Sequence, residues 1–409
     1  MNIVLEPGAA ALLDELHRAG FGAYAVGGCV RDSLLGLAPH DWDLCTAACP
    51  GQVMELFGED RCIPTGLQHG TVTVKRDGKL YEITTFRTEG RYSDGRHPDS
   101  VAFVPDLRED LARRDFTINA MAYSAEEGLC DPFGGREDLA RGVVRAVGEP
   151  LRRFGEDALR ILRLYRFAAR FGFAIDEATE AAAKQLAAHL DCVSAERIEE
   201  ELNKLLAAPQ PGAYLEPEVL AFVLPELPPE ELTKARRRID ALPAGTEQVS
   251  ARWAALLLPL GEAGARKALK RLKCSNARID GVAALVRECG EKTSDAPDRC
   301  DLRLQAKRLL GKHDLHTVQQ LTALWTALAP EEKGSFDALR AEAEALTAQG
   351  ACCRISQLAV NGRDLMAAGA APGPGLRRAL EALLEEVITG RLPNEKTELL
   401  AFAAGFSAS

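Results

Sequence analysis

The hydrophobic pattern of this 409-residue chain changes near residue 142, and this change limits the folds open to it. Before that point, short apolar runs alternate with turn signals, which predicts strands and short connections. From residue 154 onward, apolar residues recur at helical spacing, with breaks at glycine and proline clusters. The length also predicts more than one domain. We therefore expect an α+β head with helices around a small mixed or antiparallel sheet, followed by an all-α remainder.

The composition is that of a globular protein. Hydrophobic residues make up 46% of the chain and charged residues 27%, values far from those of disordered chains. No apolar run approaches the ~18 residues that span a bilayer, and residues 1–20 lack the pattern of a signal peptide. The 11 cysteines are odd in number and irregularly spaced, which disfavours a disulfide framework. We expect a soluble, cytoplasmic protein without membrane contact.

A glycine pair marks the first candidate site. Residues 22–26 form a short apolar run that ends in Gly27 and Gly28, and residues 30–37 then show helical spacing. This pattern predicts a strand, a glycine turn and a helix. Backbone N–H groups at such a helix start favour a phosphate, which Arg31 would help to bind. A tight turn that merely requires glycine is the alternative.

Two carboxylates follow the glycine turn at a short distance. On a strand, Asp41 and Asp43 would project from one face and Trp42 from the other. Two acids on one face repel each other unless a cation joins them. Mg²⁺ suits this arrangement because it takes one or two carboxylates and completes its shell with water and substrate phosphates. We predict a Mg²⁺ site at Asp41 and Asp43, with an acidic surface loop as the alternative.

A predicted hairpin supplies a third acid. Residues 71–75 and 80–86 alternate in period two around an Asp-Gly pair, which is a strong turn signal. Glu82 lies in the second strand between apolar neighbours. It either takes part in catalysis beside the metal or faces solvent on an edge strand. Residues 88–100 contain two glycines, a proline and several charges without periodicity, and we expect a mobile loop there.

Two longer motifs connect these features to a known family. The motif positions are GGCVRD at residues 27–32, DWD at 41–43, RRDFTINA at 113–120 and DPFGGREDL at 131–139. Together they resemble the class II nucleotidyltransferases, which comprise CCA-adding enzymes and bacterial poly(A) polymerases. The resemblance implies that Arg31 and Arg114 bind phosphates, for which a guanidinium fork is suited. It also implies a ribose contact from Asp115 or Asn119, with a helix cap as the alternative for Asp115.

The segment EDALR at residues 156–160 resembles the family's nucleotide-selecting motif. Asp157 and Arg160 are three positions apart and would share one face of a helix. An aspartate accepts from an exocyclic amine, and an arginine donates to a ring nitrogen or carbonyl. Cytosine and adenine present this order, whereas guanine and uracil reverse it, so the pair would admit CTP and ATP without a template. A salt bridge on a solvated helix is the alternative.

The region around this segment is strongly basic. Residues 141–170 carry eight arginines against three acids, a net charge of +5 in a chain whose net charge is −10. This local excess indicates an anionic ligand. The resemblance implies that Arg163 and Arg166 contribute to the nucleotide site.

Later motifs are less specific. Ser194 and Arg197 belong to the last motif shared with the family, and we favour a helix start as their role. Two basic clusters, at residues 234–238 and 266–273, either contact RNA phosphates or form solvated helix faces.

The resemblance covers residues 22–205 in its motifs and the whole chain in its layout. It implies a catalytic head at residues 1–142, a nucleotide-selecting neck at 143–206, a helical body at 207–325 and a tRNA-binding helical tail at 326–409. The implied reaction is Mg²⁺-dependent addition of CCA to the tRNA 3′ end, in which the RNA 3′-hydroxyl attacks the α-phosphate of CTP or ATP and pyrophosphate leaves. No obligate protein partner is evident.

Three alternatives to full CCA addition remain. Within the family they are an A-adding enzyme and a poly(A) polymerase. The resemblance disfavours CC-only addition, because CC-adding members of the family lack a full loop and residues 87–96 retain one. Outside the family, the head could be catalytically silent and the chain an RNA-binding module. The paired acids argue against a silent head, because such a domain has no physical need for two adjacent like charges.

Overall fold

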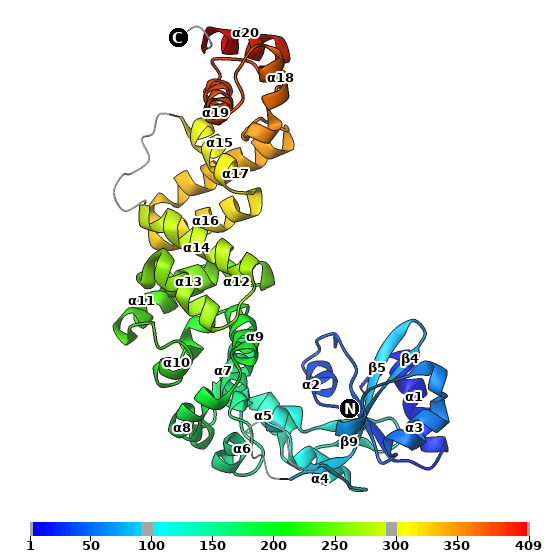
Figure 1. The fold of residues 1–409 in the computed structure, drawn as a ribbon. Coiled ribbons are helices and arrows are strands. Elements are labelled where there is room, and N and C mark those ends of the chain that lie inside the picture. Colours follow the sequence, from blue (N-terminus) through cyan, green and yellow to red (C-terminus); the bar gives the residue numbers. More distant parts are fainter. Residues whose placement is uncertain (1–2, 91–100, 292–300, 407–409) are drawn as a thin grey trace. The chain divides into compact units, whose positions relative to one another are not determined.

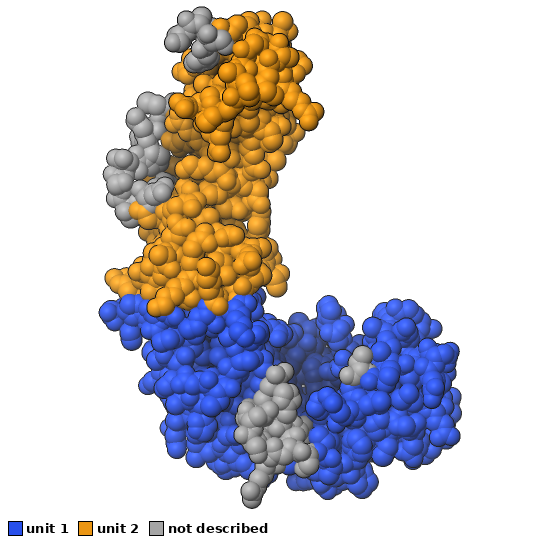
Figure 2. Space-filling model, in the orientation of Figure 1, with its two compact units in different colours: residues 1–230, 271–273 blue, residues 231–270, 274–409 orange. Residues whose placement is uncertain are grey.

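The computed structural model describes residues 3–90, 101–291 and 301–406. The chain divides into two compact units, Met1–Glu230 with Arg271–Lys273 and Glu231–Lys270 with Cys274–Ser409 (Figure 2). All strands of the described residues belong to the first unit (Figure 1). Within the described ranges, no helix has the length and apolar character needed to cross a membrane.

A seven-stranded sheet lies at the centre of the first unit, in the order β3-β4-β5-β2-β1-β8-β9. Its strands are β1 (Ala23–Val26), β2 (Leu44–Thr46), β3 (Cys62–Gly66), β4 (Thr71–Arg76), β5 (Lys79–Thr85), β8 (Ala122–Ser124) and β9 (Gly128–Cys130). β2 and β5 run parallel, and the other neighbours are antiparallel. The predicted small mixed sheet is confirmed.

The predicted hairpin is confirmed as well. β4 and β5 pair antiparallel along their length. The turn between them places Asp77 at φ 50° and Gly78 at φ 76°. Both residues are in the left-handed region, as a two-residue type I′ turn requires. The Asp-Gly pair therefore sets the register that places Glu82 on the sheet.

Two expected boundaries were wrong. The strand expected at residues 41–44 begins only at Leu44. In the parallel register of β2 and β5, a strand extended to Asp43 would set it beside Glu82, and such like-charged neighbours destabilise pairing. The loop expected from residue 88 also begins later, because β6 (Arg87–Glu89) pairs with β7 (Val101–Phe103). Residues 91–100, the rest of that expected loop, lie outside the described residues.

Helices complete the first unit. They are α1 (Pro7–Arg18), α2 (Gly28–Leu34), α3 (Pro50–Phe57), α4 (Leu107–Ala112), α5 (Gly135–Arg141), α6 (Pro150–Glu156), α7 (Leu159–Phe171), α8 (Glu177–Gln185), α9 (Ala195–Leu206) and α10 (Pro217–Val223). A 3-10 turn, η3 (Thr117–Asn119), and a small parallel pair, β10 (Val143–Val144) with β11 (Ala174–Ile175), lie among them. Four helices begin with proline, whose fixed φ suits the first helical position.

The continuous helix expected through residues 156–160 is wrong. α6 ends at Glu156 and α7 begins at Leu159, while Asp157 between them is extended at φ −144°. The Asp157 carboxylate accepts a hydrogen bond from the backbone N–H of Leu159 at 3.0 Å. A short acidic side chain that bonds the backbone in this way starts a new helix instead of continuing the old one. Asp157 and Arg160 therefore do not share a helix face.

The described part of the second unit is helical, as expected. Its helices are α11 (Pro229–Asp240), α12 (Val249–Leu257), α13 (Gly261–Arg271), α14 (Asn276–Glu291), α15 (Leu302–Lys312), α16 (Leu315–Leu328), α17 (Lys333–Ala348), α18 (Gly362–Ala367), α19 (Pro374–Ile388) and α20 (Lys396–Phe406). Apolar faces of α18, α19 and α20 form one cluster around Leu365, Leu383 and Leu399, which are buried. Such helices are stabilised mainly by this packing.

Candidate active site

Three acidic side chains meet where β2 and β5 run side by side. The parallel register pairs Leu44 with Ile83. One residue earlier, Asp43 precedes β2 and Glu82 lies in β5, so the two side chains lie on the same face of the sheet. Glu82 is exposed while its neighbours in β5 are buried. Asp41, two residues before Asp43, is 82% exposed. The acids predicted from separate segments are thus neighbours on one edge, which we call the acidic edge.

The acidic edge carries uncompensated negative charge. Partial desolvation by the surrounding protein atoms raises the pKa of Asp43 most. The charges of Glu82 and Asp41 raise this pKa further, and the charge of Arg114 lowers it. Mg²⁺ fits this donor set, since one or two carboxylates suffice when water and phosphate oxygens supply its other ligands. Within the described ranges, no three acidic, histidine or cysteine side chains are close enough to hold a metal ion unaided.

The glycine turn combines an unusual backbone conformation with a close approach of Arg114. Gly27 caps α2 at φ 77°, a conformation that favours glycine, and its N–H donates to the Met121 carbonyl at 3.0 Å. A Cβ on Gly27 would lie only 2.8 Å from Nη1 of Arg114. Gly28 begins α2, as predicted. The positive φ is therefore what favours glycine at position 27, and a side chain there would also displace the Arg114 guanidinium.

Arg31 points inward instead of toward the turn. Its side chain is 4% exposed, donates from Nε to Asp32 Oδ1 at 2.8 Å and also bonds Asn119. The guanidinium lies 5.1 Å and 5.0 Å from the ring centres of Phe167 and Phe171. Burial lowers the pKa of Arg31, although the charge of Asp32 opposes this. Because the side chain is enclosed by these contacts, its phosphate-binding role stays a prediction.

Asp115 and Asn119 extend this bonded chain to α7. Asn119 donates from Nδ2 to Asp115 Oδ1 at 3.0 Å, and Asp115 Oδ2 accepts from Arg163 Nε at 2.9 Å and Nη2 at 2.6 Å. Burial alone would raise the pKa of Asp115, but Arg163 and the Asn119 hydrogen bond outweigh it and hold the pKa well below its ordinary value. Asp115 also accepts from the Phe116 N–H at 2.8 Å. The ribose contacts predicted for this pair are not tested by these bonds.

Arg166 supports the same region from within. It is 8% exposed and donates from Nε to Glu201 Oε2 at 2.5 Å. Its guanidinium lies 3.9 Å from the ring centre of Phe167. Glu201, on α9, also lies 3.7 Å from Arg163 Nη1. One carboxylate thus joins both predicted nucleotide-site arginines of α7 to α9.

A cavity of about 290 Å³ brings most of the predicted nucleotide residues together. It is lined by Arg113, Arg114, Asp115, Asp157, Leu159, Arg160, Arg163 and Arg197. Five of these eight side chains are arginines and two are aspartates, so the lining has an excess of positive charge. Arginines in such number are suited to a polyphosphate, which accepts paired hydrogen bonds. We call this the arginine cavity.

Asp157 and Arg160 both face the arginine cavity, although the reason expected for their proximity was wrong. Asp157 accepts from Arg197 Nη2 at 2.8 Å and Nη1 at 3.3 Å. Arg160 donates from Nη1 to Glu156 Oε2 at 2.9 Å and from Nη2 to the Arg113 carbonyl at 3.2 Å. A carboxylate has about four acceptor sites and a guanidinium five donors, so each retains capacity for a base edge.

Sequence reasoning missed part of this site. Asp110 and Glu201 were not predicted, and Arg197 was expected only at a helix start. α9 does begin after Ser194, but the Ser194 side chain makes no capping bond. The available signal was the four-residue spacing of Arg197 and Glu201, which places them on one helix face.

The motif at residues 131–139 has a structural role in the described residues. The Asp131 carboxylate accepts from the backbone N–H groups of Gly135 at 2.7 Å and Arg136 at 2.8 Å, which starts α5. A Cβ on Gly135 would lie 2.2 Å from the Thr117 carbonyl oxygen, so only glycine permits this approach. Asp138 accepts from Thr117 Oγ1 at 2.7 Å. The motif therefore docks α5 against η3.

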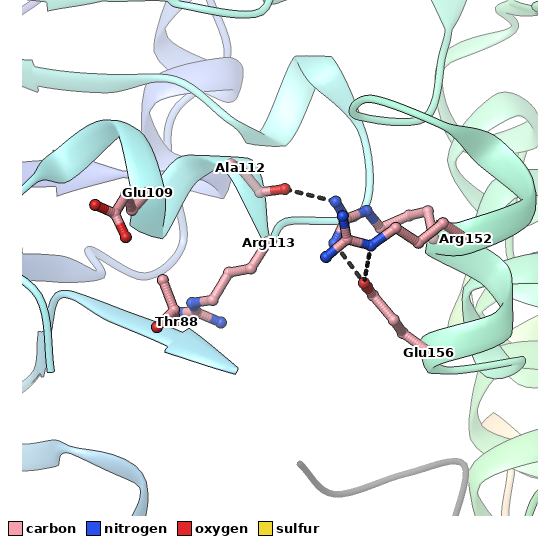
Figure 3. A pocket seen from close by; sticks show the side chains of 7 residues that line it. Thr88, Glu109, Ala112, Arg113, Arg152 and Glu156 are labelled. Carbon is pink, nitrogen blue, oxygen red and sulfur yellow. Dashed lines mark hydrogen bonds and ion pairs between the residues drawn. The ribbon is translucent and has the colours of Figure 1, made fainter. Parts of the chain in front are cut away.

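A second pocket, of about 200 Å³, shares Arg113 with the arginine cavity. It is lined by Thr88, Glu109, Ala112, Arg113, Arg152, Arg153 and Glu156 (Figure 3). Figure 3 shows the Arg113 side chain beside Thr88. Glu156 accepts from Arg153 Nη1 at 2.7 Å and from Arg160 at 2.9 Å. Glu156 thus holds Arg160 from the side of the second pocket.

The two later basic clusters are largely paired with acids. Arg266 lies 2.7 Å from Asp280, and Arg271 lies 2.7 Å from Glu226. By contrast, Lys267 and Lys270 are exposed on α13 and have no ion pair with any described residue. These pairs do not test contact with RNA phosphates, which stays a prediction for both clusters.

Known family models match three segments of the chain. The Poly A polymerase head domain matches residues 23–145. The probable RNA and SrmB-binding site of polymerase A matches residues 172–228. A model described as tRNA nucleotidyltransferase domain 2, putative, matches residues 245–403.

Full-length relatives agree with these matches. The CCA-adding enzyme of Limosilactobacillus fermentum is 39% identical over 408 residues, covering 96% of this chain and 95% of that protein. The CCA-adding enzyme of Latilactobacillus sakei is 40% identical over 402 residues, covering 96% of each. A crystal structure of the Bacillus stearothermophilus CCA-adding enzyme in complex with CTP has a TM-score of 0.80 and 33% identity, covering 99% of this chain and 98% of that one.

Proposed function

This chain belongs to the family of CCA-adding enzymes, and from that membership we propose that it builds the CCA end of tRNA from CTP and ATP without a nucleic-acid template. The observation that carries the proposal is the arginine cavity, which holds Asp157 and Arg160 together among five arginines. An acceptor and a donor at this spacing match the edges of cytosine and adenine. The arginines around them match a triphosphate.

The reaction proposed is nucleotidyl transfer. The 3′-oxygen of the RNA attacks the α-phosphorus of the bound nucleotide, and a new P–O bond forms. The bond from the α-phosphorus to the α,β-bridging oxygen breaks, and pyrophosphate leaves with that electron pair. The hydroxyl proton passes to solvent or to Glu82, which lies beside Asp43 on the acidic edge.

Nucleotidyltransferases of this family use a divalent metal, and we propose Mg²⁺ for this chain. Asp41 and Asp43 would hold it, because they are exposed carboxylates that repel each other. Bound there, Mg²⁺ would neutralise phosphate charge and lower the pKa of the attacking hydroxyl. The protein itself would supply further positive charge to the nucleotide, through Arg114 and the arginines of α7.

The other proposed roles follow from the same arrangement. Arg114 would bind the triphosphate, and Asp157 with Arg160 would select the base. Arg163 and Arg166 would shape the cavity through Asp115 and Glu201. Arg31 would act through Asn119, since it is enclosed.

We also propose the finer division of the chain and its setting. The head, neck, body and tail would occupy residues 1–142, 143–206, 207–325 and 326–409, with the helical regions binding tRNA. The enzyme would act in the cytoplasm, where tRNA is processed, without an obligate protein partner.

The decisive test is incorporation of each labelled nucleotide, in the presence of Mg²⁺, into three tRNAs that end at the discriminator base, at CC and at CCA. The expected product is C, C and A added in order, with no extension of the finished end. Addition of A to the CC end alone would indicate an A-adding enzyme, and long adenylate tails a poly(A) polymerase. If no nucleotide is incorporated while RNA still binds, the chain is an RNA-binding module.

A further inference from the structure

We propose that Asp110 is a positioning residue of the nucleotide site, which holds Arg114 in place and through it the triphosphate of both CTP and ATP. This inference rests on the proposed function and deepens it. The motifs that led to the site do not include Asp110, which lies three residues before one of them, RRDFTINA. The argument therefore depends on contacts in the fold.

The Asp110 carboxylate is buried and connects three segments. It lies on α4, and its side chain is 0% exposed. Oδ1 accepts from Arg113 Nε at 3.0 Å and Nη2 at 2.9 Å, and from the Arg87 N–H of β6 at 3.3 Å. Oδ2 lies 3.4 Å from Nη2 of Arg114. A single carboxylate thus bonds both consecutive arginines of the motif.

Arg114 depends on Asp110 for its position. Among the described residues, Asp110 is the only hydrogen-bonding or ion-pairing partner of the Arg114 side chain. The Nε of Arg114 is buried without a hydrogen-bond partner. Its Nη1 lies against the glycine turn, 2.8 Å from the place of a Gly27 Cβ. One end of the guanidinium is therefore anchored by Asp110, and the side chain lines the arginine cavity.

The charge balance supports the same role. Burial alone would raise the pKa of Asp110, but Arg113 and Arg114 outweigh it and hold the pKa below its ordinary value. Asp110 is therefore ionised at neutral pH and offsets one of two positive charges. The remaining charge faces a cavity whose chemistry suits phosphate oxygens. A nucleotide phosphate in that cavity would supply Arg114 with a second acceptor.

The position of Asp110 relative to the base-selecting residues makes the proposal specific. Asp110 bonds neither the Asp157 carboxylate nor the Arg160 side chain, whose partners are Arg197, Glu156 and backbone carbonyls. Loss of the Asp110 carboxylate should therefore weaken the binding of CTP and the binding of ATP by the same factor. A change in base preference is not expected.

A purely structural role is the competing explanation, and Asp138 provides a matched control. Asp138 is 5% exposed and is also a buried head carboxylate paired with an arginine, at 3.2 Å from Arg145 Nε. It bonds Thr117 instead of Arg113 or Arg114. Asp110→Asn and Asp138→Asn each replace one such carboxylate by an amide of similar size. Both substitutions should lower the stability of the fold, but only Asp110→Asn should weaken binding of the triphosphate.

The experiment measures KM and kcat for CTP and for ATP with both variants on the tRNAs described above. For Asp110→Asn we expect KM for both nucleotides to rise by about tenfold to a hundredfold, with kcat less affected, as for a misplaced binding group. For Asp138→Asn we expect KM near that of the unmodified enzyme. An unchanged KM for Asp110→Asn, or an equal rise for Asp138→Asn, would overturn the proposal.

Two further measurements separate this inference from the proposed function. Inorganic tripolyphosphate, used as a binding probe, should bind the Asp110→Asn variant more weakly by a similar factor, and this readout requires no turnover. If the unmodified enzyme adds no nucleotide but tripolyphosphate binding still depends on Asp110, the proposed function fails and the positioning role stands. Arg114→Gln should show the same KM rise, and combining it with Asp110→Asn should add little. Full additivity would contradict action through Arg114.

Should Asp110→Asn not fold, Asp110→Glu keeps the carboxylate but moves it by one methylene. The same joint rise in KM for both nucleotides is then expected. An unchanged KM in a folded Asp110→Glu protein would equally contradict the positioning role.

Discussion

The acidic edge and the arginine cavity belong to one candidate site but differ in how their side chains are bonded. On the acidic edge, Asp41 is 82% exposed, and its one ion pair within the described residues is to His40, which is 96% exposed. In the cavity wall, Asp115 is 8% exposed and bonds both Asn119 and Arg163. Asp41 therefore lies open to solvent, whereas Asp115 in the cavity wall is bonded to side chains within the protein.

The difference indicates a division of labour. Exposed like charges add nothing to the stability of the fold, so the acidic edge can serve chemistry alone. Buried, paired side chains hold elements together, so the cavity wall serves shape as well as binding. Substitutions on the acidic edge should therefore affect activity without stability, and substitutions in the wall should affect both.

The largest effect is expected from the acidic edge. Asp43→Asn keeps the size of the side chain and removes the charge that would hold the metal. We expect nucleotide incorporation to fall by at least about 10³-fold, because several kcal/mol of charge stabilisation are lost. The melting temperature should not fall, since burial and then the charges of Glu82 and Asp41 raise the pKa of Asp43, so that its charge does not stabilise the fold. Incorporation assays and thermal unfolding of the same preparation test both statements.

Glu82→Gln sharpens this result. If Glu82 receives the proton or helps hold the ion, activity should fall without loss of stability. Equal activity of Glu82→Gln and the unmodified enzyme would assign Glu82 to the solvent face of β5. A large fall in melting temperature for Asp43→Asn would contradict the proposed difference between the acidic edge and the arginine cavity.

A smaller effect is expected in the cavity, on base selection. Arg197→Met removes the partner that fixes Asp157 from α9 while keeping an apolar stem. We expect discrimination against UTP and GTP to fall by about tenfold to a hundredfold, which corresponds to one bidentate contact. Competition assays with all four nucleotides measure it. Lys204→Met is the matched control on α9, because Lys204 is exposed and, in the part of the chain that the structure describes, pairs only with Glu200.

The features that could be predicted from the sequence are those set by residues close by in the chain. The Asp-Gly pair of the hairpin needs no distant partner, because positive φ at both positions determines the turn. The two acids were predicted from their mutual repulsion, and Glu82 from its place in the second hairpin strand. These local signals sufficed for the head fold and for the acidic edge.

The cavity wall could not be predicted in the same way. Arg31 is enclosed by Phe167 and Phe171, which lie more than 130 positions away in the chain. The helix break at Asp157 depends on one side-chain bond to the Leu159 N–H, which competes with an otherwise helical pattern. Glu201 acquires its role only through Arg163 and Arg166 on another helix. Asp110 did have a local signal that was missed, because Arg113 and Arg114 lie three and four positions after it. Residues whose roles are set by tertiary partners carry no local signal.

The next effect is one of stability. Asp115→Asn leaves Arg163 without its charged partner in a largely buried position. Removal of one partner from a buried pair costs ~3–5 kcal/mol, and we expect about 2 kcal/mol because Arg163 is a third exposed and retains Glu201 nearby. The melting temperature should fall by about 4–8 °C. Asp41→Asn, measured in parallel, should leave it unchanged, and an equal fall in both would remove the distinction.

The smallest effect concerns acid stability. The pKa of Asp115 is lowered in the folded protein from an ordinary value of 3.8, so its charge stabilises the fold at pH values above that value. As the pH falls below about 4, the unfolded chain binds a proton that folded Asp115 does not, and this stabilisation declines by about 1.4 kcal/mol per pH unit. The stability gap between the unmodified protein and Asp115→Asn should thus be constant from pH 8 to 5.

At pH 3 the gap should have narrowed by about 1 kcal/mol. Thermal unfolding of both proteins across this range measures the gap directly, and Arg163 does not titrate there, so the change belongs to the carboxylate. A gap that stays constant down to pH 3 would mean that Asp115 stabilises α7 by hydrogen bonding alone. The charge of Asp115 would then contribute nothing to the stability of the cavity wall. The wall would differ from the acidic edge only in how deeply its side chains are buried.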